Sequence, residues 1–263
     1  MLPFFADNGF CTAPGVFTPA EVADMRRVLT DIFDNAPAQP GDMNHPRYGM
    51  VRPNLLRYPE VYRRLFTPRV MSACRQLVDE RFAKPDEHFV IIPEHGFHRN
   101  GFGTWHKDSD ANERAGLDFH WHPGYSPVQI AIYLQDNSVE FGGGISVSPG
   151  SHKIPNPNNL LQKPEMREMW YQDKKRGAVL SKAGDLVAFD TRLDHCATER
   201  NPHQAAPWGD KLALFFVIGL RDQHAERLTA FLRSRPDYRF LQEYSIPEEA
   251  AAIAREHKFG FFL

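Results

Sequence analysis

The stretch Thr104-Trp105-His106-Lys107-Asp108 holds a histidine and an aspartate two positions apart, and it is the best starting point for the fold. On an extended strand, side chains at positions i and i+2 point to the same face. The imidazole of His106 and the carboxylate of Asp108 could then bind one metal ion together. Two protein ligands are too few for a tight metal site, so the spacing predicts a third ligand from another part of the chain.

The best candidate for the third ligand is His195, which follows Gly184-Asp185 and the apolar run 186–189. A strand over this run would place His195 near a strand end beside the core, where ligands on rigid elements converge. Two histidines and one carboxylate on one face of a metal, with the other positions open, form the arrangement of non-heme Fe(II) oxygenases. We therefore expect His106, Asp108 and His195 to converge.

Two other pairs share the spacing. His120 and His122 lie in a polar, aromatic stretch over 109–124, and no third ligand is spaced to partner them. His224 and Glu226 lie in a predicted helix, where residues two apart diverge. We interpret the first pair as part of a substrate pocket, whose expected residues are Trp105, His120, Trp121, His122 and Tyr125.

The composition is that of an ordinary globular protein. The chain has 263 residues, 42% of them hydrophobic and 24% charged, and its net charge of −2 predicts no partnership with nucleic acid or an anionic membrane. No run approaches the length of a membrane span, and residues 1–7 lack the basic start of a signal peptide. Three scattered cysteines suit a reducing compartment, so we expect a cytoplasmic protein.

Helices are expected before the β-rich part. Residues 3–15 have the pattern of a short strand that enters a turn. Thr18 and Glu21 match a capping box, which predicts a helix with an apolar stripe over 22–33. Residues 35–56 are rich in turn signals, and we expect a loop there that is long enough to shape a ligand site. A second helical region is predicted over 59–82, with a break near Pro68.

The middle of the chain has the period of strands, and residues 222–263 are predicted to be rich in helix. Short strands separated by turn signals favour a closed or sandwich-like β core. We therefore expect one domain over 1–263, mainly β with flanking helices (α+β). The expected strands cover residues 88–92, 101–105 leading into the metal motif, 128–134, 186–189 and 212–219, and a further short strand is expected between two turns within 142–152.

Lys211 and Gln129 stand where they could contact a ligand. Lys211 precedes the last strand, where its ammonium could hold a carboxylate or, more commonly, extend to water. Gln129 heads strand 128–134 and would share a face with Ala131 and Tyr133. That face could equally point to solvent.

In this order, the motifs resemble those of the phytanoyl-CoA dioxygenase family of Fe(II)- and 2-oxoglutarate-dependent oxygenases. The resemblance covers residues 5 to about 220 of the sequence. Its parts are an opening strand and helix, a metal motif, a glycine-rich signature and a distal-histidine strand, here residues 5–21, 105–108, 133–152 and 184–195.

The resemblance implies a double-stranded β-helix, or jelly-roll, core of the cupin-like kind. It implies Fe(II) held by His106, Asp108 and His195, with 2-oxoglutarate as co-substrate. Lys211 stands where the family usually has an arginine for the far carboxylate of 2-oxoglutarate, and Arg200 is the other candidate. A lysine offers a point charge without the bidentate fork of arginine. Gln129 matches a strand position near the co-substrate.

We therefore expect an enzyme that uses O2 to hydroxylate or desaturate a small-molecule substrate and that releases succinate and CO2. Two alternatives remain open on the sequence. One is a non-catalytic, cupin-like binding protein, and the other is an isomerase or hydrolase on the same barrel that needs metal but neither 2-oxoglutarate nor O2.

Overall fold

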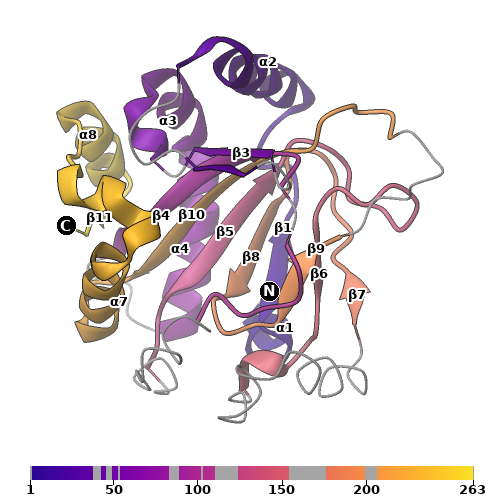
Figure 1. Ribbon diagram of the computed structural model, residues 1–263. Helices are drawn as coiled ribbons and strands as arrows, with labels where there is room; N and C mark the ends of the chain where they lie inside the picture. The colour runs from indigo at the N-terminus through magenta and orange to yellow at the C-terminus, as the bar shows by residue number, and fades with distance from the viewer. Residues whose placement is uncertain are drawn as a thin grey trace.

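An eight-stranded sheet forms the centre of the computed structural model, in the order β1-β8-β5-β10-β4-β3-β2 with β11 paired to β4 (Figure 1). The structure describes residues 2–37, 43–45, 49–52, 54–82, 89–101, 103–109, 124–153, 176–198 and 206–262. The strands of this sheet are β1 (Phe10–Ala13), β2 (Met43–His45), β3 (Gly49–Arg52), β4 (Phe89–Arg99), β5 (Val128–Tyr133), β8 (Leu186–Asp190), β10 (Leu212–Leu220) and β11 (Phe259–Phe261).

A second sheet has the order β7-β6-β9 and consists of β6 (Ile145–Val147), β7 (Gly177–Ala178) and β9 (His195–Ala197). The two sheets share one buried apolar cluster, to which the large sheet contributes Tyr133, Phe189 and Ala213 and the small sheet contributes Val147. These two packed sheets, antiparallel except where β11 pairs with β4, form the expected double-stranded β-helix core. The predicted strands over 128–134, 186–189 and 212–219 are confirmed as β5, β8 and β10, and the short strand expected within 142–152 is confirmed as β6.

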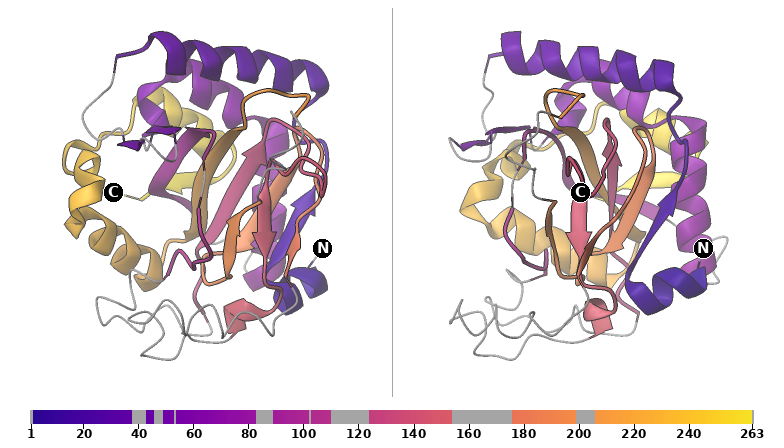
Figure 2. Two further views of the ribbon diagram at one scale, coloured as in Figure 1. Left: turned by 45° about the vertical axis from the view of Figure 1, so that its right-hand side comes forward. Right: turned by 90° about the vertical axis from the view of Figure 1, so that its right-hand side faces the viewer.

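Helices cover the other face of the large sheet (Figure 2), and α4 lies behind it in Figure 1. The capping box at the start of α2 is confirmed, because Thr18 N donates to Glu21 Oε2 at 2.7 Å and Glu21 N donates to Thr18 Oγ1 at 3.3 Å. Apolar side chains of these helices join the main core with the outer residues of β5 and β10. The helices are α2 (Pro19–Asn35), α3 (Pro59–Leu65) and α4 (Pro68–Phe82), with the expected break before Pro68.

The prediction for residues 3–15 is wrong in its first half, because residues 2–8 form helix α1 (Leu2–Asn8) before β1 begins. The helix ends at Gly9, whose φ of 82° is the left-handed conformation that suits glycine after a helix. Gly9 N donates to Phe5 O at 2.7 Å and closes the last turn. Adjacent aromatic residues such as Phe4 and Phe5 are typical of strands, but here both belong to helix α1, which buries Phe5.

The loop predicted over 35–56 is also wrong in part, because the structure contains the hairpin β2–β3 there. Strand β3 extends the large sheet by pairing with β4, where Val51 lies opposite His98 and Arg52 opposite Phe97. A short 3-10 helix, η1 (Leu55–Arg57), follows the hairpin. Pairing with a strand about 45 residues away is tertiary information that the turn-rich local sequence does not contain.

The C-terminal part is rich in helix, as expected, and returns to the sheet as β11, a strand that the sequence did not predict. Helix α7 packs with its apolar side against Val90, Ile92 and Val217 of the large sheet. None of the helices in the described part of the chain combines the length and the apolar character needed to cross a membrane. The elements of this part are α7 (Gln223–Ser234), the 3-10 helix η5 (Pro236–Glu243) and α8 (Glu248–Glu256).

The side chain of His95 ties β4 to this C-terminal part and predicts a pH dependence of stability. His95 Nε2 lies 2.8 Å from Tyr244 Oη, and burial lowers the pKa of His95 to about 4. The unfolded chain, with an ordinary histidine pKa, therefore binds more protons between about pH 6.5 and 4. The stability contributed by neutral His95 is complete above this window and is lost as the pH falls through it.

We expect the metal-free protein to lose about 2–3 kcal/mol from this residue between pH 7 and 4.5. His95→Gln offers an amide to Tyr244 but does not titrate, so its free energy of unfolding should fall less over the same range. Urea unfolding at the two pH values measures both losses. Equal losses in the two proteins would contradict a neutral, buried His95.

Candidate metal centre

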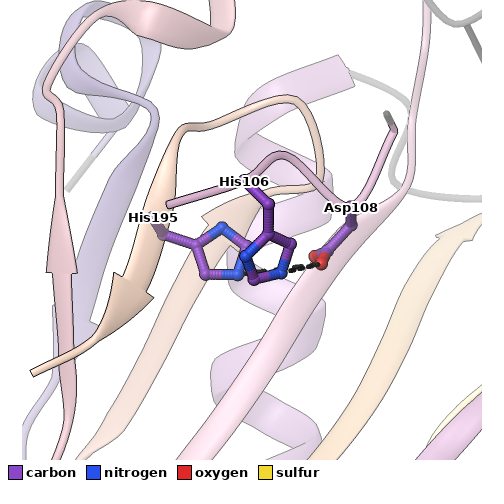
Figure 3. A group of neighbouring side chains, drawn as sticks. All are labelled: His106, Asp108 and His195. Atoms are coloured by element: carbon purple, nitrogen blue, oxygen red, sulfur yellow. Dashed lines mark ion pairs between the residues drawn. The ribbon is translucent and has the colours of Figure 1, made fainter. Parts of the chain in front are cut away.

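Three side chains converge at the edge of the small sheet. One ligand atom from each of His106, Asp108 and His195 lies within 4.8 Å of the other two. The described part of the chain contains no other such group of three potential metal ligands. Asp108 Oδ1 lies 3.5 Å from His106 Nε2 and 3.7 Å from His195 Nε2. Figure 3 shows both imidazole rings turned toward the carboxylate. The expected convergence of the three residues is confirmed.

Main-chain carbonyl groups fix the tautomer of both histidines. His106 Nδ1 lies 2.7 Å from Thr104 O, and His195 Nδ1 lies 3.0 Å from Leu193 O. A carbonyl oxygen only accepts hydrogen bonds, so each Nδ1 carries a hydrogen, and in the neutral imidazole that binds a metal each Nε2 keeps its lone pair. Both lone pairs are therefore available where the Asp108 carboxylate lies, and such partners behind a ligand orient it for a metal.

The backbone brings the two histidines together. His106 N donates to His195 O at 3.0 Å and His195 N donates to His106 O at 2.9 Å, which makes one antiparallel bridge. Residues directly opposite each other in such a pair present their side chains on the same face. Ser109 N donates to Thr191 O at 3.1 Å and fixes the chain just after Asp108. The sequence predicts a strand around His106. Among the described residues, the structure has only the single bridge between His106 and His195 there.

The electrostatics of the site favour an ionised Asp108. Burial alone would raise the pKa of this carboxyl, but attraction to His195 and His106 in their protonated form holds the pKa below its usual range. Two imidazole nitrogens and an anionic carboxylate form a donor set suited to Fe(II). The residues present therefore fit the metal that the sequence motif implies.

Lys211 does not extend to water. Its side chain is buried, and its Nζ donates to Gly144 O at 3.1 Å, so it crosses from the start of β10 to the chain just before β6. The ammonium lies 5.9 Å from the centre of the Tyr133 ring. The structure therefore places the cation between the two sheets, on the side of the core that also holds the metal ligands.

Gln129 and Tyr133 are both buried, so the solvent-facing alternative for this face of β5 is wrong. Gln129 Nε2 donates to Phe216 O at 3.2 Å and to Ile130 O at 3.3 Å, which holds its amide against the neighbouring strand. Burial, and to a smaller extent the charge of Asp108, raises the pKa of Tyr133. The inner face of β5 thus lies near the metal ligands.

His98 is an inner-face residue that sequence reasoning missed. It lies opposite Ala213, which belongs to the cluster between the sheets, and its ring centre is 4.6 Å from that of Phe215. Burial and the nearby charge of Lys211 lower the pKa of His98 to about 4, so its imidazole is neutral. The sequence signal is that an apolar residue, Phe97, is followed by a polar one, His98, as in a strand with two different faces. Which environment each face meets is decided by the pairing of β4 with β10, and the local sequence does not contain that information.

The expected substrate residues are only partly described. The ring of Trp105 stacks with Arg176, whose Cζ lies 4.3 Å from the ring centre. Tyr125 is fully buried, and its Oη accepts a hydrogen bond from Thr191 Oγ1 at 3.1 Å. Their contact with a substrate stays a prediction. His120, Trp121, His122 and the alternative carboxylate partner Arg200 lie outside the described residues.

The fold and the three converging ligands define a class, the double-stranded β-helix proteins with a two-histidine, one-carboxylate centre. The sequence matches the phytanoyl-CoA dioxygenase (PhyH) family over residues 5–204. The chain therefore belongs to this family of iron- and 2-oxoglutarate-dependent oxygenases. No curated protein matches it.

Three solved structures illustrate the similarity in fold. HygX from Streptomyces hygroscopicus, solved with nickel, 2-oxoglutarate and hygromycin B, is 24% identical with a TM-score of 0.59, over 83% of this chain and 85% of HygX. EctD from S. alaskensis, solved with 2-oxoglutarate and 5-hydroxyectoine, is 17% identical with a TM-score of 0.59, over 82% and 74%. The non-heme α-ketoglutarate-dependent epimerase SnoN from nogalamycin biosynthesis is 18% identical with a TM-score of 0.59, over 82% and 78%.

Proposed function

We propose that the protein is an Fe(II)- and 2-oxoglutarate-dependent hydroxylase of a small molecule. The convergence of His106, Asp108 and His195, with both Nε2 lone pairs available, carries this proposal. These three residues would hold the iron. When bound, iron and 2-oxoglutarate supply oxidation by O2, in which one oxygen atom enters succinate with loss of CO2 and the other enters the product. The protein positions the reactants and excludes water.

Lys211 would bind the far carboxylate of 2-oxoglutarate. An ammonium group has three N–H donors, and the Gly144 carbonyl accepts one of them. The buried position of Lys211 strengthens its attraction for an anion. Gln129 and Tyr133 line the same side of the core, and Gln129 is the second residue that we assign to the co-substrate.

The substrate would enter beside the iron and contact Trp105, His120 and His122. HygX and EctD were solved with a polar small molecule, and their likeness in fold supports a similar class of substrate here. A net charge of −2 does not favour a polyanionic partner such as an acyl-CoA or a nucleic acid. A polar biosynthetic intermediate is therefore the class of substrate that we favour. The cytoplasmic location stays a prediction.

The test is 2-oxoglutarate turnover. Purified protein with Fe(II), 2-oxoglutarate and O2 should release succinate, faster when a pool of polar metabolites contains the substrate. A binding protein would release none. An isomerase or hydrolase would act on its substrate without 2-oxoglutarate or O2, and an epimerase would give a product of unchanged mass. A product that gains one oxygen atom from labelled O2 would identify a hydroxylase.

The retained Asp108 predicts the outcome of the reaction in chloride. In related iron halogenases a small residue replaces this carboxylate and leaves a metal position for chloride. Asp108 lies within 3.7 Å of both imidazoles, so its carboxylate would occupy that position. We expect hydroxylation or desaturation, and no halogenation, when the substrate is converted in high chloride. Product masses provide the measurement, and a chlorinated product from the unmutated protein would overturn the ligand role of Asp108.

A further inference from the structure

The residue after β4, Asn100, has an unusual backbone. Its φ is 54°, and within the described residues it shares the left-handed region with just one other non-glycine residue, Lys258, whose φ is 60°. Asparagine is among the side chains that tolerate this conformation best, but the conformation still has a cost for any residue with a Cβ. A strained backbone needs compensating contacts to persist.

These contacts are hydrogen bonds to the start of β10. Asn100 N donates to Lys211 O at 2.7 Å, and Lys211 N donates to Asn100 Oδ1 at 2.9 Å. Asn100 Nδ2 also donates to Asp210 Oδ1 at 2.7 Å. The left-handed turn therefore lets one residue hold both main-chain groups of Lys211, one with its backbone and one with its side chain.

Asp210 is itself held in place by two arginines. Arg99 Nε donates to Asp210 Oδ2 at 2.8 Å, and Arg99 also pairs with Asp34 of α2. Arg26 Nη2 donates to the Asp210 carbonyl at 2.9 Å. The main chain at residues 210 and 211 is thus fixed from β4 and from α2, and it is the point from which the Lys211 side chain begins its path to Gly144.

We propose that Asn100 is the positioning residue that sets where the Lys211 ammonium lies and so sets the affinity for 2-oxoglutarate. This inference rests on the proposed function, because it needs Lys211 to bind the co-substrate. A lysine has a flexible four-carbon stem, and its charge reaches a defined place only if the backbone under it is fixed. Asn100 would act through Lys211 and would not touch the co-substrate.

The variant that tests this is Asn100→Gly, because glycine keeps the positive φ without strain and removes only the side-chain bonds. Lys258→Gly is the matched control, since it makes the same change at the other left-handed position, between α8 and β11. The dissociation constant of 2-oxoglutarate is measured by calorimetry on Fe(II)-loaded protein without O2. Each glycine variant is also combined with Lys211→Ala.

We expect Asn100→Gly to raise this dissociation constant about three- to tenfold, the range for losing one or two hydrogen bonds. Lys258→Gly should change it by less than about twofold, as for a surface substitution. In the Lys211→Ala background Asn100→Gly should add less than about twofold, because residues that act as a unit are not additive. Iron affinity should be the same in all variants.

Hydrogen exchange gives a second readout that needs no ligand. In metal-free Asn100→Gly the amide of Lys211 should exchange faster, whereas the amide of Leu212, which donates to Gln135 Oε1 at 2.8 Å, should keep its protection. Unchanged exchange at Lys211 would contradict the positioning role, even in a variant that binds 2-oxoglutarate poorly.

The two hypotheses fail in different ways. If wild-type protein does not bind 2-oxoglutarate, the proposed function falls and this inference falls with it. If wild type binds it and Asn100→Gly binds it equally well, only the inference is overturned. An effect of Asn100→Gly that is equally large with and without Lys211 would also overturn it, because the residue would then act by another route.

Discussion

His195→Ala is expected to abolish iron binding and 2-oxoglutarate turnover while the protein stays folded. The substitution removes one of the two Nε2 donors, and the remaining imidazole and carboxylate are too few for a tight site. Mutation of a residue that only supports a metal ligand lowers metal affinity or activity roughly 10–100-fold. Loss of a ligand itself should therefore lower turnover by more than about a hundredfold. His106→Ala and Asp108→Ala should behave in the same way.

Iron content after dialysis, succinate release and circular dichroism measure the three parts of this prediction. His257→Ala, at the end of α8, is the matched control and should keep full activity. His120→Ala and His122→Ala should keep iron and alter only the handling of substrate. Full turnover by His195→Ala would show that the third ligand comes from elsewhere in the chain.

Lys211→Ala is expected to raise the KM for 2-oxoglutarate by roughly tenfold or more, since a lost charge-assisted bond costs about 1.5–3 kcal/mol. Lys211→Met is the better-matched variant, because it keeps an unbranched side chain beside Tyr133 and removes only the charge. Lys211→Arg should restore part of the affinity, limited by the space between the two sheets. The measurement is succinate formation at varied 2-oxoglutarate.

Arg200 gives this prediction its sharpest contrast. An unchanged KM in Lys211→Ala together with a raised KM in Arg200→Ala would move the carboxylate contact to Arg200. Raised values in both variants would mean that both cations contribute to binding the same anion. A fall in iron content in Lys211→Ala would instead show that the residue supports the metal centre.

The parts of the fold that could be predicted are those whose cause is local in sequence. The capping box of Thr18 and Glu21 needs only four residues, and the spacing of His106 and Asp108 needs only three. The motif order then made His195 the natural third ligand. Local patterns of this kind hold because the same short-range contacts act in any surrounding structure.

The rest depends on partners far along the chain. Lys211 is buried because Gly144, which is 67 residues away, accepts its hydrogen bond. His98 faces the interior because β4 pairs with β10, and β3 is a strand because β4 is beside it. The role of Asn100 could not be predicted from the sequence, because it depends on a left-handed backbone conformation that only the folded chain requires.

The backbone bridge between His106 and His195 has a consequence for how the centre is loaded. The two histidines are joined through their main chains, and their rings are anchored by carbonyl groups, so the protein itself supplies these restraints. The entropy cost of ordering these ligands is therefore incurred during folding and does not lower the affinity for the metal. An ion can leave without releasing a disordered segment at this bridge, so exchange of one divalent ion for another should be easily reversible.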